Sequence, residues 1–381
     1  MSDRQRPERI AAIFAGALAL AGCQQFQNLT GAGTVAGERT GAVGPSAGAT
    51  ATAQRTDPDM AQVISALGAL GVQPIETLSV ERARAQPSPA DAVKRVLQER
   101  GQSMAPRPVP QVRDITVPTP AGPIPARVYG PARGAAAAPL IVYWHGGGWV
   151  IADLDTYDAS ARALQASTGA VVLSLHYRQA PEHKFPAAHE DALAGYRWAV
   201  ANARSLGADP RRIAVAGESA GGNLAIDTAI AARDAGLPMP KHMALVYPVA
   251  GTDTNTPSYT ENTATAPLSR AGMLWFVDKV TRSQADLQDP RLDVVGRANL
   301  RGLPPATIVS AELDPLRSEG ETLAAKLRAA GVPVEQRTYD GVTHEFFGMA
   351  PVVADAASAQ ELVGERLRTT LGSGGGRVAS R

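Results

Sequence analysis

The sequence lacks the features of a nucleic-acid-binding, zinc-binding or disulfide-stapled protein. Its 381 residues carry a formal net charge of +1 and no long basic stretch, so we expect no nucleic-acid partner. Cys23 is the single cysteine, which excludes a disulfide within the chain. The six histidines are scattered and no Cys/His spacing is typical of a zinc site, so we expect no metal. Apolar residues make up 44% of the chain, enough for a sizeable buried core.

Near its N-terminus the chain has an apolar run that is too short to cross a membrane. Residues 10–21 form this run behind three arginines, whereas a membrane-spanning helix needs about 20 apolar residues. The pattern is typical of a secretory signal. It ends in Leu20-Ala21-Gly22-Cys23, which resembles a bacterial lipoprotein signal with a lipidated cysteine. We therefore expect residues 1–22 to be a lipoprotein signal peptide and Cys23 to anchor the mature chain.

The alternatives to lipidation are an ordinary signal peptide and an uncleaved anchor with a bystander cysteine. The only cysteine of the chain occupies the one position that a lipoprotein signal requires, which favours lipidation. Several acyl chains together anchor a protein stably in a lipid membrane. We therefore expect an exported protein, lipid-anchored in the cell envelope. Gln24 follows the cysteine, and the resemblance to lipoproteins implies that a residue other than Asp there directs the protein to the outer membrane or its periplasmic face, if the cell is double-membraned.

Composition divides the rest of the chain into four parts. Residues 23–56 are rich in Gly, Ala, Thr, Ser and Gln and predict a flexible tether. Residues 57–107 have apolar positions at helical spacing and end in a Pro-rich stretch, which predicts N-terminal helices. Residues 108–371 carry the main folded pattern, and the Gly-rich residues 372–381 predict a frayed tail.

Within the main part, short apolar strands alternate with amphipathic helices. A hairpin is predicted over residues 112–129, from alternation around a Pro-Ala-Gly-Pro turn. Further strands are predicted over 140–144, 170–175, 213–216, 243–247, 307–310 and 334–339, and helices over 187–204, 224–233 and 316–330. This alternation predicts an α/β fold with a mainly parallel sheet covered on both faces. Ligands bind such sheets at the carboxyl ends of the strands.

One pentapeptide, Gly217-Glu218-Ser219-Ala220-Gly221, combines a Gly-x-Ser-x-Gly pattern with a strand before it and a helix after it. This context is that of a nucleophile elbow, in which the serine stands on a sharp turn. Residues 44–48 match the same pattern, but no apolar run precedes them and no helical pattern follows. We interpret that second match as chance and Ser219 as the candidate nucleophile.

A serine hydroxyl becomes a strong nucleophile when a base takes its proton and a carboxylate orients that base. His344 fits the base, because it follows the last predicted strand on a loop. Asp314 fits the carboxylate, since it lies between Ser219 and His344 directly after a strand. Glu312 is the nearest rival but belongs to the strand end, and Asp314 before Pro315 is also a good helix cap. The order Ser, Asp, His is that of α/β-hydrolases.

A glycine-rich loop, His145-Gly146-Gly147-Gly148-Trp149, ends the strand at Trp144. Three glycines leave backbone N–H groups able to approach a substrate oxygen. Such donors stabilise the oxyanion of a tetrahedral intermediate, typically by about 3–4 kcal/mol each. The alternative is a plain flexible turn, but the position after an apolar strand and upstream of the elbow favours an oxyanion hole.

With these motifs in view, residues 57–371 resemble the hormone-sensitive-lipase family of esterases, which have the α/β-hydrolase fold. Besides the elbow and the glycine-rich loop, the similar segments are Asp153-Leu154-Asp155-Thr156, Tyr177-Arg178-Gln179-Ala180-Pro181-Glu182, Phe185-Pro186-Ala187-Ala188 and Leu313-Asp314-Pro315-Leu316. The resemblance implies Ser219 as nucleophile, His344 as base and Asp314 as its orienter. It also implies a helical cap, formed by the N-terminal helices and an insertion at about residues 265–295.

The resemblance further implies how the loops around the nucleophile act. Oxyanion donors would be the backbone N–H groups of Gly147, Gly148 and Ala220, with His145, Gly146 and Glu218 supporting them. Relatives commonly carry Asp where this chain has His176, which puts the local hydrogen bonding in doubt. Many carry Asp in place of Glu218, which raises the question of how the elbow is braced. Trp275 and Phe276 are candidates to line the cap, with packing inside it as the alternative.

Together the residues and the resemblance predict a serine carboxylesterase for short- to medium-chain acyl esters, without a cofactor. Hydrolysis of amides, lactones or carbamates at the same site is one alternative. A non-catalytic ligand-binding protein is another, since some relatives became receptors by losing the histidine, but this chain retains all three residues. The expected partners are a small-molecule ester and, through Cys23, a lipid membrane. The oligomeric state stays open, with an edge-strand homodimer as one option that the resemblance suggests.

Overall fold

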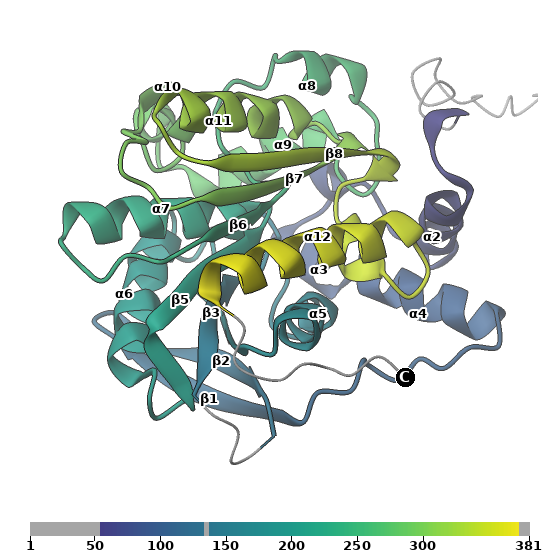
Figure 1. The fold of residues 1–381 in the computed structure, drawn as a ribbon. Coiled ribbons are helices and arrows are strands. Elements are labelled where there is room, and N and C mark those ends of the chain that lie inside the picture. The colour runs from purple at the N-terminus through teal and green to yellow at the C-terminus, as the bar shows by residue number, and fades with distance from the viewer. Residues whose placement is uncertain (1–53, 133–136, 373–381) are drawn as a thin grey trace, which may run out of the picture. The chain divides into compact units, whose positions relative to one another are not determined.

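A computed structural model describes residues 54–132 and 137–372 (Figure 1). The expected signal peptide, Cys23, nearly all of the tether and the tail beyond residue 372 lie outside these ranges. Within them, no helix is long and apolar enough to cross a membrane. No cluster of three or more His, Cys, Asp or Glu side chains in the same ranges has the arrangement to hold a metal ion.

An eight-stranded sheet forms the centre of the fold, with the order β1-β2-β4-β3-β5-β6-β7-β8. The strands are β1 (Gln111–Thr119), β2 (Gly122–Gly130), β3 (Ala138–Trp144), β4 (Val171–Leu175), β5 (Ala208–Glu218), β6 (Met243–Val246), β7 (Ala306–Leu313) and β8 (Val334–Thr343). β1 pairs with β2 and β2 with β4 in antiparallel fashion, and the remaining neighbours are parallel. The predicted hairpin and mainly parallel sheet are therefore confirmed.

Helices cover both faces of this sheet, as the strand pattern requires. The helices that pack against it are α5 (Asp158–Thr168), α6 (Ala187–Asn202), α7 (Ala220–Asp234), α11 (Arg317–Ala329) and α12 (Ala354–Leu371). α6, α7 and α11 share one hydrophobic cluster, and α5 and α12 share the other. The strand β3 contributes to both clusters in alternation: Leu140 and Val142 face the first, and Ile141 and Tyr143 the second. The sequence pattern did not predict α5 or α12.

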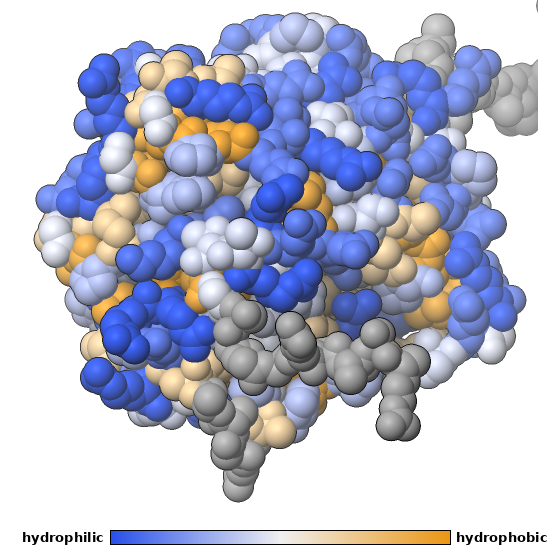
Figure 2. Space-filling model, in the orientation of Figure 1, coloured by the Kyte–Doolittle hydropathy of each residue, from blue (hydrophilic) through white to orange (hydrophobic). Residues whose placement is uncertain are grey.

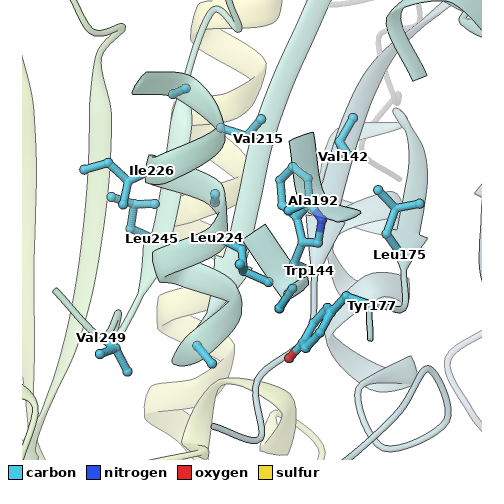
Figure 3. Packing of buried hydrophobic residues seen from close by; sticks show 14 of the residues in the cluster. Val142, Trp144, Leu175, Tyr177, Ala192, Val215, Leu224, Ile226, Leu245 and Val249 are labelled. Atoms are coloured by element: carbon cyan, nitrogen blue, oxygen red, sulfur yellow. The ribbon is translucent and has the colours of Figure 1, made fainter. Parts of the chain in front are cut away.

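The first cluster fixes the helix that carries the candidate nucleophile. Val142, Val215 and Leu245, from three neighbouring strands, belong to the same cluster as Leu224 and Ile226 of α7 (Figure 3). All five side chains are fully buried, and each contributes about 1.5–3 kcal/mol of hydrophobic stabilisation. The start of α7, and the turn before it, are thus held rigidly against the sheet.

Two groups of shorter elements lie at the carboxyl ends of the strands. The N-terminal group comprises α2 (Pro58–Ala69), η1 (Ile75–Thr77), α3 (Val80–Ala85) and α4 (Pro89–Glu99). The group between β6 and β7 comprises α8 (Pro257–Glu261), α9 (Arg270–Val280), η2 (Gln284–Gln288) and α10 (Val294–Arg297), and the last short helix is η3 (Phe346–Met349). The two groups touch where the indole N–H of Trp275 donates to the carbonyl oxygen of Leu78 at 3.2 Å. We call these two groups the cap.

On the face shown in Figure 2, apolar surface forms separated areas among hydrophilic side chains. Among the described residues, the large apolar side chains that are exposed are Met104, Val112 and Leu274. Apolar side chains scattered singly are normal on soluble proteins. The exposed apolar side chains of the described residues therefore do not mark a docking site by themselves.

Candidate active site

Ser219 occupies a strained turn between β5 and α7. Its backbone angles are φ 55° and ψ −120°, a region that residues other than glycine rarely adopt. The flanking glycines make the turn sterically feasible: a Cβ at Gly217 would collide with the carbonyl of Gly221, and one at Gly221 with the carbonyl of Trp144. The Gly-x-Ser-x-Gly pattern thus has a direct structural cause in the close approach of helix, turn and strand.

Ser219, His344 and Asp314 form a continuous hydrogen-bonded chain. The Nδ1–H of His344 donates to Oδ2 of Asp314 at 2.7 Å, which leaves Nε2 to accept from the Ser219 hydroxyl at 2.9 Å. Asp314 follows β7 and His344 follows β8, so parallel neighbours bring them together. Asp314 also accepts from the N–H of Leu316 at 2.9 Å, but α11 begins at Arg317 with Leu316 as its N-cap, so Asp314 does not cap this helix. Glu312 lies in β7 and pairs with Arg55 instead.

The electrostatic environment favours a proton on His344. Burial by itself would lower the pKa of this imidazole, but the charge of Asp314 and the hydrogen bond to it outweigh burial, so the pKa is raised above its ordinary value. Both side chains are buried, which keeps their interaction from being weakened by water. The pair can accept a proton from Ser219 and stabilise the imidazolium that results.

The glycine-rich loop turns at Gly147 and Gly148, whose φ angles are 91° and 57°. A Cβ at Gly147 would collide with the carbonyl of Ile151, and one at Gly148 with the ring of Phe276 from the cap. Ala220 is the first residue of α7, where the N–H has no partner within the helix. Gly147 and Gly148 line the same pocket as Ser219, and Ala220 directly follows Ser219, so the backbone N–H groups of these residues are candidate donors at the site.

A pair of imidazoles supports this loop. The Nδ1–H of His145 donates to the carbonyl of Gly146 at 2.8 Å, so its Nε2 accepts from Nδ1–H of His176 at 2.9 Å. The hydroxyl of Tyr177 donates to the carbonyls of His145 and Gly146, each at 3.0 Å. Burial and the neighbouring His176 lower the pKa of His145 to about 3, so it is uncharged. His176 therefore supplies a hydrogen bond here rather than removing one.

Glu218 braces the elbow from beneath through two tyrosines. The hydroxyl of Tyr143 donates to its Oε1 at 2.6 Å, and that of Tyr247 to its Oε2 at 2.5 Å. Burial raises the pKa of Glu218 to about 7, although both tyrosine hydrogen bonds oppose that shift. The two hydrogen bonds connect Tyr143, near the end of β3, and Tyr247, directly after β6, to Glu218 at the end of β5, next to Ser219.

A second carboxylate, which the sequence analysis did not single out, lies beside the base. Glu345 directly follows His344, and its Oε1 is 3.8 Å from Nε2 of His344. It has a left-handed backbone (φ 73°) and accepts a 2.5 Å hydrogen bond from Tyr157. Its position next to His344 could have identified Glu345 from the sequence. The direction of its side chain could not have been predicted, because it depends on this unusual backbone conformation.

A pocket of about 270 Å³ opens above Ser219 and His344. Most of its apolar lining comes from the cap: Leu67, Ile75, Leu268, Met273 and Phe276. Trp275 is not among the lining residues and packs its ring edge-on against Phe276, with centroids 5.2 Å apart. Of the two aromatic candidates, Phe276 therefore lines the pocket and Trp275 packs within the cap.

The other buried histidines serve packing. His189 contacts the amide of Asn223 at 2.9 Å, and His242 contacts the hydroxyl of Thr307 at 2.9 Å. Burial lowers the pKa of each to about 4, so both are neutral. Neither side chain lines the pocket above Ser219.

Comparison with known proteins agrees with this geometry. The chain is 44% identical over 240 residues to a carboxylesterase of Mycobacterium tuberculosis (NlhH), covering 62% of this chain and 75% of that protein. It is 43% identical over 253 residues to an esterase of the same organism (LipI), covering 65% and 79%. The structure of an esterase from Pyrobaculum calidifontis superimposes with a TM-score of 0.74 at 37% identity, covering 82% of this chain and 98% of that one. The profile of the alpha/beta hydrolase fold family matches residues 141–348, and this chain belongs to that family.

Proposed function

We propose that this chain is a serine carboxylesterase that hydrolyses short- to medium-chain acyl esters through an acyl-enzyme. The observation that carries the proposal is the hydrogen-bonded chain from Ser219 through His344 to Asp314, at 2.9 and 2.7 Å, beneath a pocket. The two relatives from Mycobacterium tuberculosis are a carboxylesterase and an esterase, which supports the ester as the substrate class. The pocket volume of about 270 Å³ lies just below the ~300–1,000 Å³ typical of ligand pockets, which favours modest acyl groups.

In the first half of the reaction, Ser219 attacks the ester carbonyl while His344 takes the proton of its hydroxyl. The carbonyl oxygen becomes an oxyanion, which the N–H groups of Gly147, Gly148 and Ala220 stabilise. Asp314 holds His344 in the required tautomer and stabilises the imidazolium. The imidazolium then gives its proton to the departing alcohol, and the acyl group stays on Ser219.

In the second half, water attacks the acyl-enzyme. His344 takes a proton from the water, a second tetrahedral intermediate forms, and its collapse returns that proton to Oγ of Ser219. The acid leaves and the enzyme is restored. Each step uses side chains and backbone groups of the chain itself, and the proposal invokes no metal or organic cofactor.

Substitution of Ser219 by alanine tests the proposal. We expect hydrolysis of p-nitrophenyl butyrate to fall by about 10⁴-fold or more, because the nucleophile is lost. A serine-reactive phosphonate should label the wild-type protein and not Ser219→Ala. An unchanged rate in Ser219→Ala, or an unlabelled and inactive wild type, would refute the assignment.

A substrate panel distinguishes ester hydrolysis from the alternative functions. Amides, lactones and carbamates would react at the same serine, and higher kcat/KM on any of these than on matched esters would replace the ester as the substrate class. A non-catalytic binding protein would neither hydrolyse any of them nor react with the phosphonate.

We further propose that the enzyme acts at the cell envelope, anchored through a lipid on Cys23. The support is the sequence Leu20-Ala21-Gly22-Cys23 after a short apolar run. Cys23→Ser should abolish incorporation of labelled fatty acid and release the protein from the membrane fraction. Continued acylation of that variant would contradict the proposal.

A further inference from the structure

Glu345 holds its carboxylate toward the reaction centre at a conformational cost. A left-handed backbone at a non-glycine residue costs about 1–3 kcal/mol and persists where the surroundings enforce it. The side chain remains 18% exposed, whereas that of His344 beside it is only 4% exposed, and both residues line the pocket above Ser219. A carboxylate that faces a substrate pocket from a strained backbone is a functional candidate.

Tyr157 fixes the direction of this carboxylate. Its hydroxyl donates to Oε1 of Glu345 at 2.5 Å. The same hydroxyl lies against the backbone of the glycine-rich loop, because a Cβ at Gly146 would collide with it. Tyr157 itself is only 5% exposed, so it has little freedom to move. The carboxylate is thus held between the oxyanion loop and the base.

The spacing between the carboxylate and the base suits one bridging water. Oε1 of Glu345 and Nε2 of His344 are 3.8 Å apart, too far for a direct hydrogen bond. A water about 2.8 Å from each atom fits that separation. Nε2 is also 2.9 Å from Oγ of Ser219, so such a water lies next to the acyl group that Ser219 would carry.

We propose that Glu345 is a positioning residue that holds the hydrolytic water for deacylation, an inference that rests on the proposed esterase function. One proton of the water points to Nε2 of His344 and the other to Oε1 of Glu345. As the water oxygen bonds to the acyl carbon, the first proton moves to His344. When the bond between the acyl carbon and Ser219 breaks, that proton passes to Oγ, and the second stays on the carboxylic acid product. Glu345 exchanges no proton in this sequence.

Acylation involves no water, so the two half-reactions should respond differently to the loss of this carboxylate. In Glu345→Ala we expect acylation by p-nitrophenyl butyrate to change less than threefold. Deacylation should slow by about 10- to 100-fold, as expected for a lost hydrogen bond to a charged group. Stopped-flow measurement should then show a burst of one equivalent of p-nitrophenolate before a slow steady state. The constants kcat and KM should fall together, with kcat/KM preserved.

Two variants keep the test specific. Glu345→Gln retains an acceptor oxygen for the water and should restore most of the deacylation rate. Glu361→Ala, the same substitution on an exposed position of α12, should leave both rates unchanged. Thermal unfolding of each variant identifies any general loss of structure.

Equal losses in acylation and deacylation would contradict the inference. If Glu345→Ala hydrolyses with no burst and its acylation rate falls as far as its deacylation rate, Glu345 acts on His344 and not on water, and the inference is wrong. Failure of the esterase proposal itself looks different, because the wild type would then neither hydrolyse esters nor react with the phosphonate.

Discussion

The guanidinium of Arg84, on α3 of the cap, donates from Nε to the main-chain carbonyl of Val150 at 2.9 Å. The N–H of Val150 in turn donates to the carbonyl of Gly147 at 3.0 Å, within the glycine-rich loop for which we propose the oxyanion donors. Arg84 also donates to the carbonyl of Ala180 at 2.9 Å and to both oxygens of Glu182 at 2.8 Å. One side chain therefore fastens the cap to the loop that would bind the transition state.

Replacing Arg84 should lower kcat/KM strongly, because the glycine-rich loop loses its support, and should change the melting temperature only slightly. Arg84→Lys cannot make the bidentate contact and reach both carbonyls at once, because an ammonium lacks the planar fork of a guanidinium. We expect kcat/KM for p-nitrophenyl butyrate to fall by about 10- to 100-fold, as for small misplacements of catalytic groups. The melting temperature should change by no more than about 4 °C.

Glu182→Gln is the matched control for Arg84, since it removes only the ion pair and leaves both carbonyl contacts. It should lower kcat/KM by less than about threefold, in line with the small energies of partly exposed ion pairs. An effect as large as that of Arg84→Lys would show that the ion pair with Glu182, and not the contacts to the two carbonyls, holds the cap to the loop.

Asp314 and Glu312 offer a direct test of which acid orients the base. Asp314→Asn should lower kcat by about 10⁴-fold, because the amide can donate to Nδ1 and would favour the wrong tautomer of His344. Glu312→Gln removes a carboxylate two residues away whose contacts are Arg55 and the N–H of Gly341. It should retain most of the wild-type kcat, and equal losses in the two variants would contradict the assignment.

The pair of His344 and Asp314 should set the acid limb of the pH profile of kcat/KM. Burial lowers the pKa of His344, but the charge and hydrogen bond of Asp314 outweigh it and raise the pKa above the ordinary 6.5. In the proposed mechanism His344 must be neutral to act as a base, so kcat/KM should fall as pH drops through that raised pKa. In Asp314→Asn the residual activity should show its acid limb at lower pH. A limb that stays in place in this variant would mean that another group controls it.

Glu218 links the elbow to the pH dependence of stability. Its pKa is about 7 in the folded protein against 4.5 in the unfolded chain, so folding favours its protonated form. The stability it contributes is present below pH 4.5 and is lost as pH rises to about 7. Glu218→Gln cannot ionise and should flatten this part of the profile, with a relative gain on the order of 3 kcal/mol at pH 8. Calorimetric melting from pH 4.5 to pH 8 measures the change.

Glu319 provides the comparison for Glu218, because burial also raises its pKa to about 7. It lies elsewhere in the fold, where it accepts from the N–H groups of Ala250 and Gly251. The wild-type slope should therefore be only partly removed in Glu218→Gln. A slope that is unchanged in this variant would show that Glu218 is already ionised at low pH or is paired differently.

The sequence predicted the sheet and the three residues that meet at its edge because these depend on local signals. Apolar runs mark the strands, glycines mark the elbow, and chain order places Asp314 and His344 after neighbouring parallel strands. The helix α12 was not predicted, although Ala356, Ala359, Val363 and Leu367 recur at helical spacing on its buried face. Many of its contact positions are small, so the periodicity is faint.

The roles of the supporting residues could not be predicted from the sequence, because they depend on contacts between distant segments. Tyr157 and Glu345 are 188 positions apart, and Arg84 is 66 positions from Val150. His176 was identified as a departure from relatives, but only the structure shows that it donates to His145. The role of such a residue depends on the group that it contacts, and no spacing pattern along the chain predicts that contact.

Phe276 should set the length of acyl chain that the pocket accepts. Its ring lines the pocket above Ser219 and also a smaller cavity of about 30 Å³, which Tyr259, Val280 and Leu292 line on the far side. Phe276→Ala would join the two spaces. We expect the ratio of kcat/KM for octanoyl over butyryl esters to rise by about tenfold or more, since each further methylene that the joined space holds is worth about 1–3 kcal/mol. A chain-length series of p-nitrophenyl esters measures that ratio.

Trp275 is the control for Phe276, because it is the next residue of α9 but does not line either cavity. Trp275→Phe removes the hydrogen bond to Leu78 and should lower the melting temperature without changing the chain-length ratio. Phe276→Ala also loses buried area, with an expected cost of about 3–5 kcal/mol, so its stability must be measured alongside its activity. A general loss of structure lowers kcat/KM for every ester alike. A change in the octanoyl-to-butyryl ratio therefore reports the loss of the Phe276 ring from the pocket lining. A ratio that stays constant in Phe276→Ala would place the limit on acyl length elsewhere in the cap.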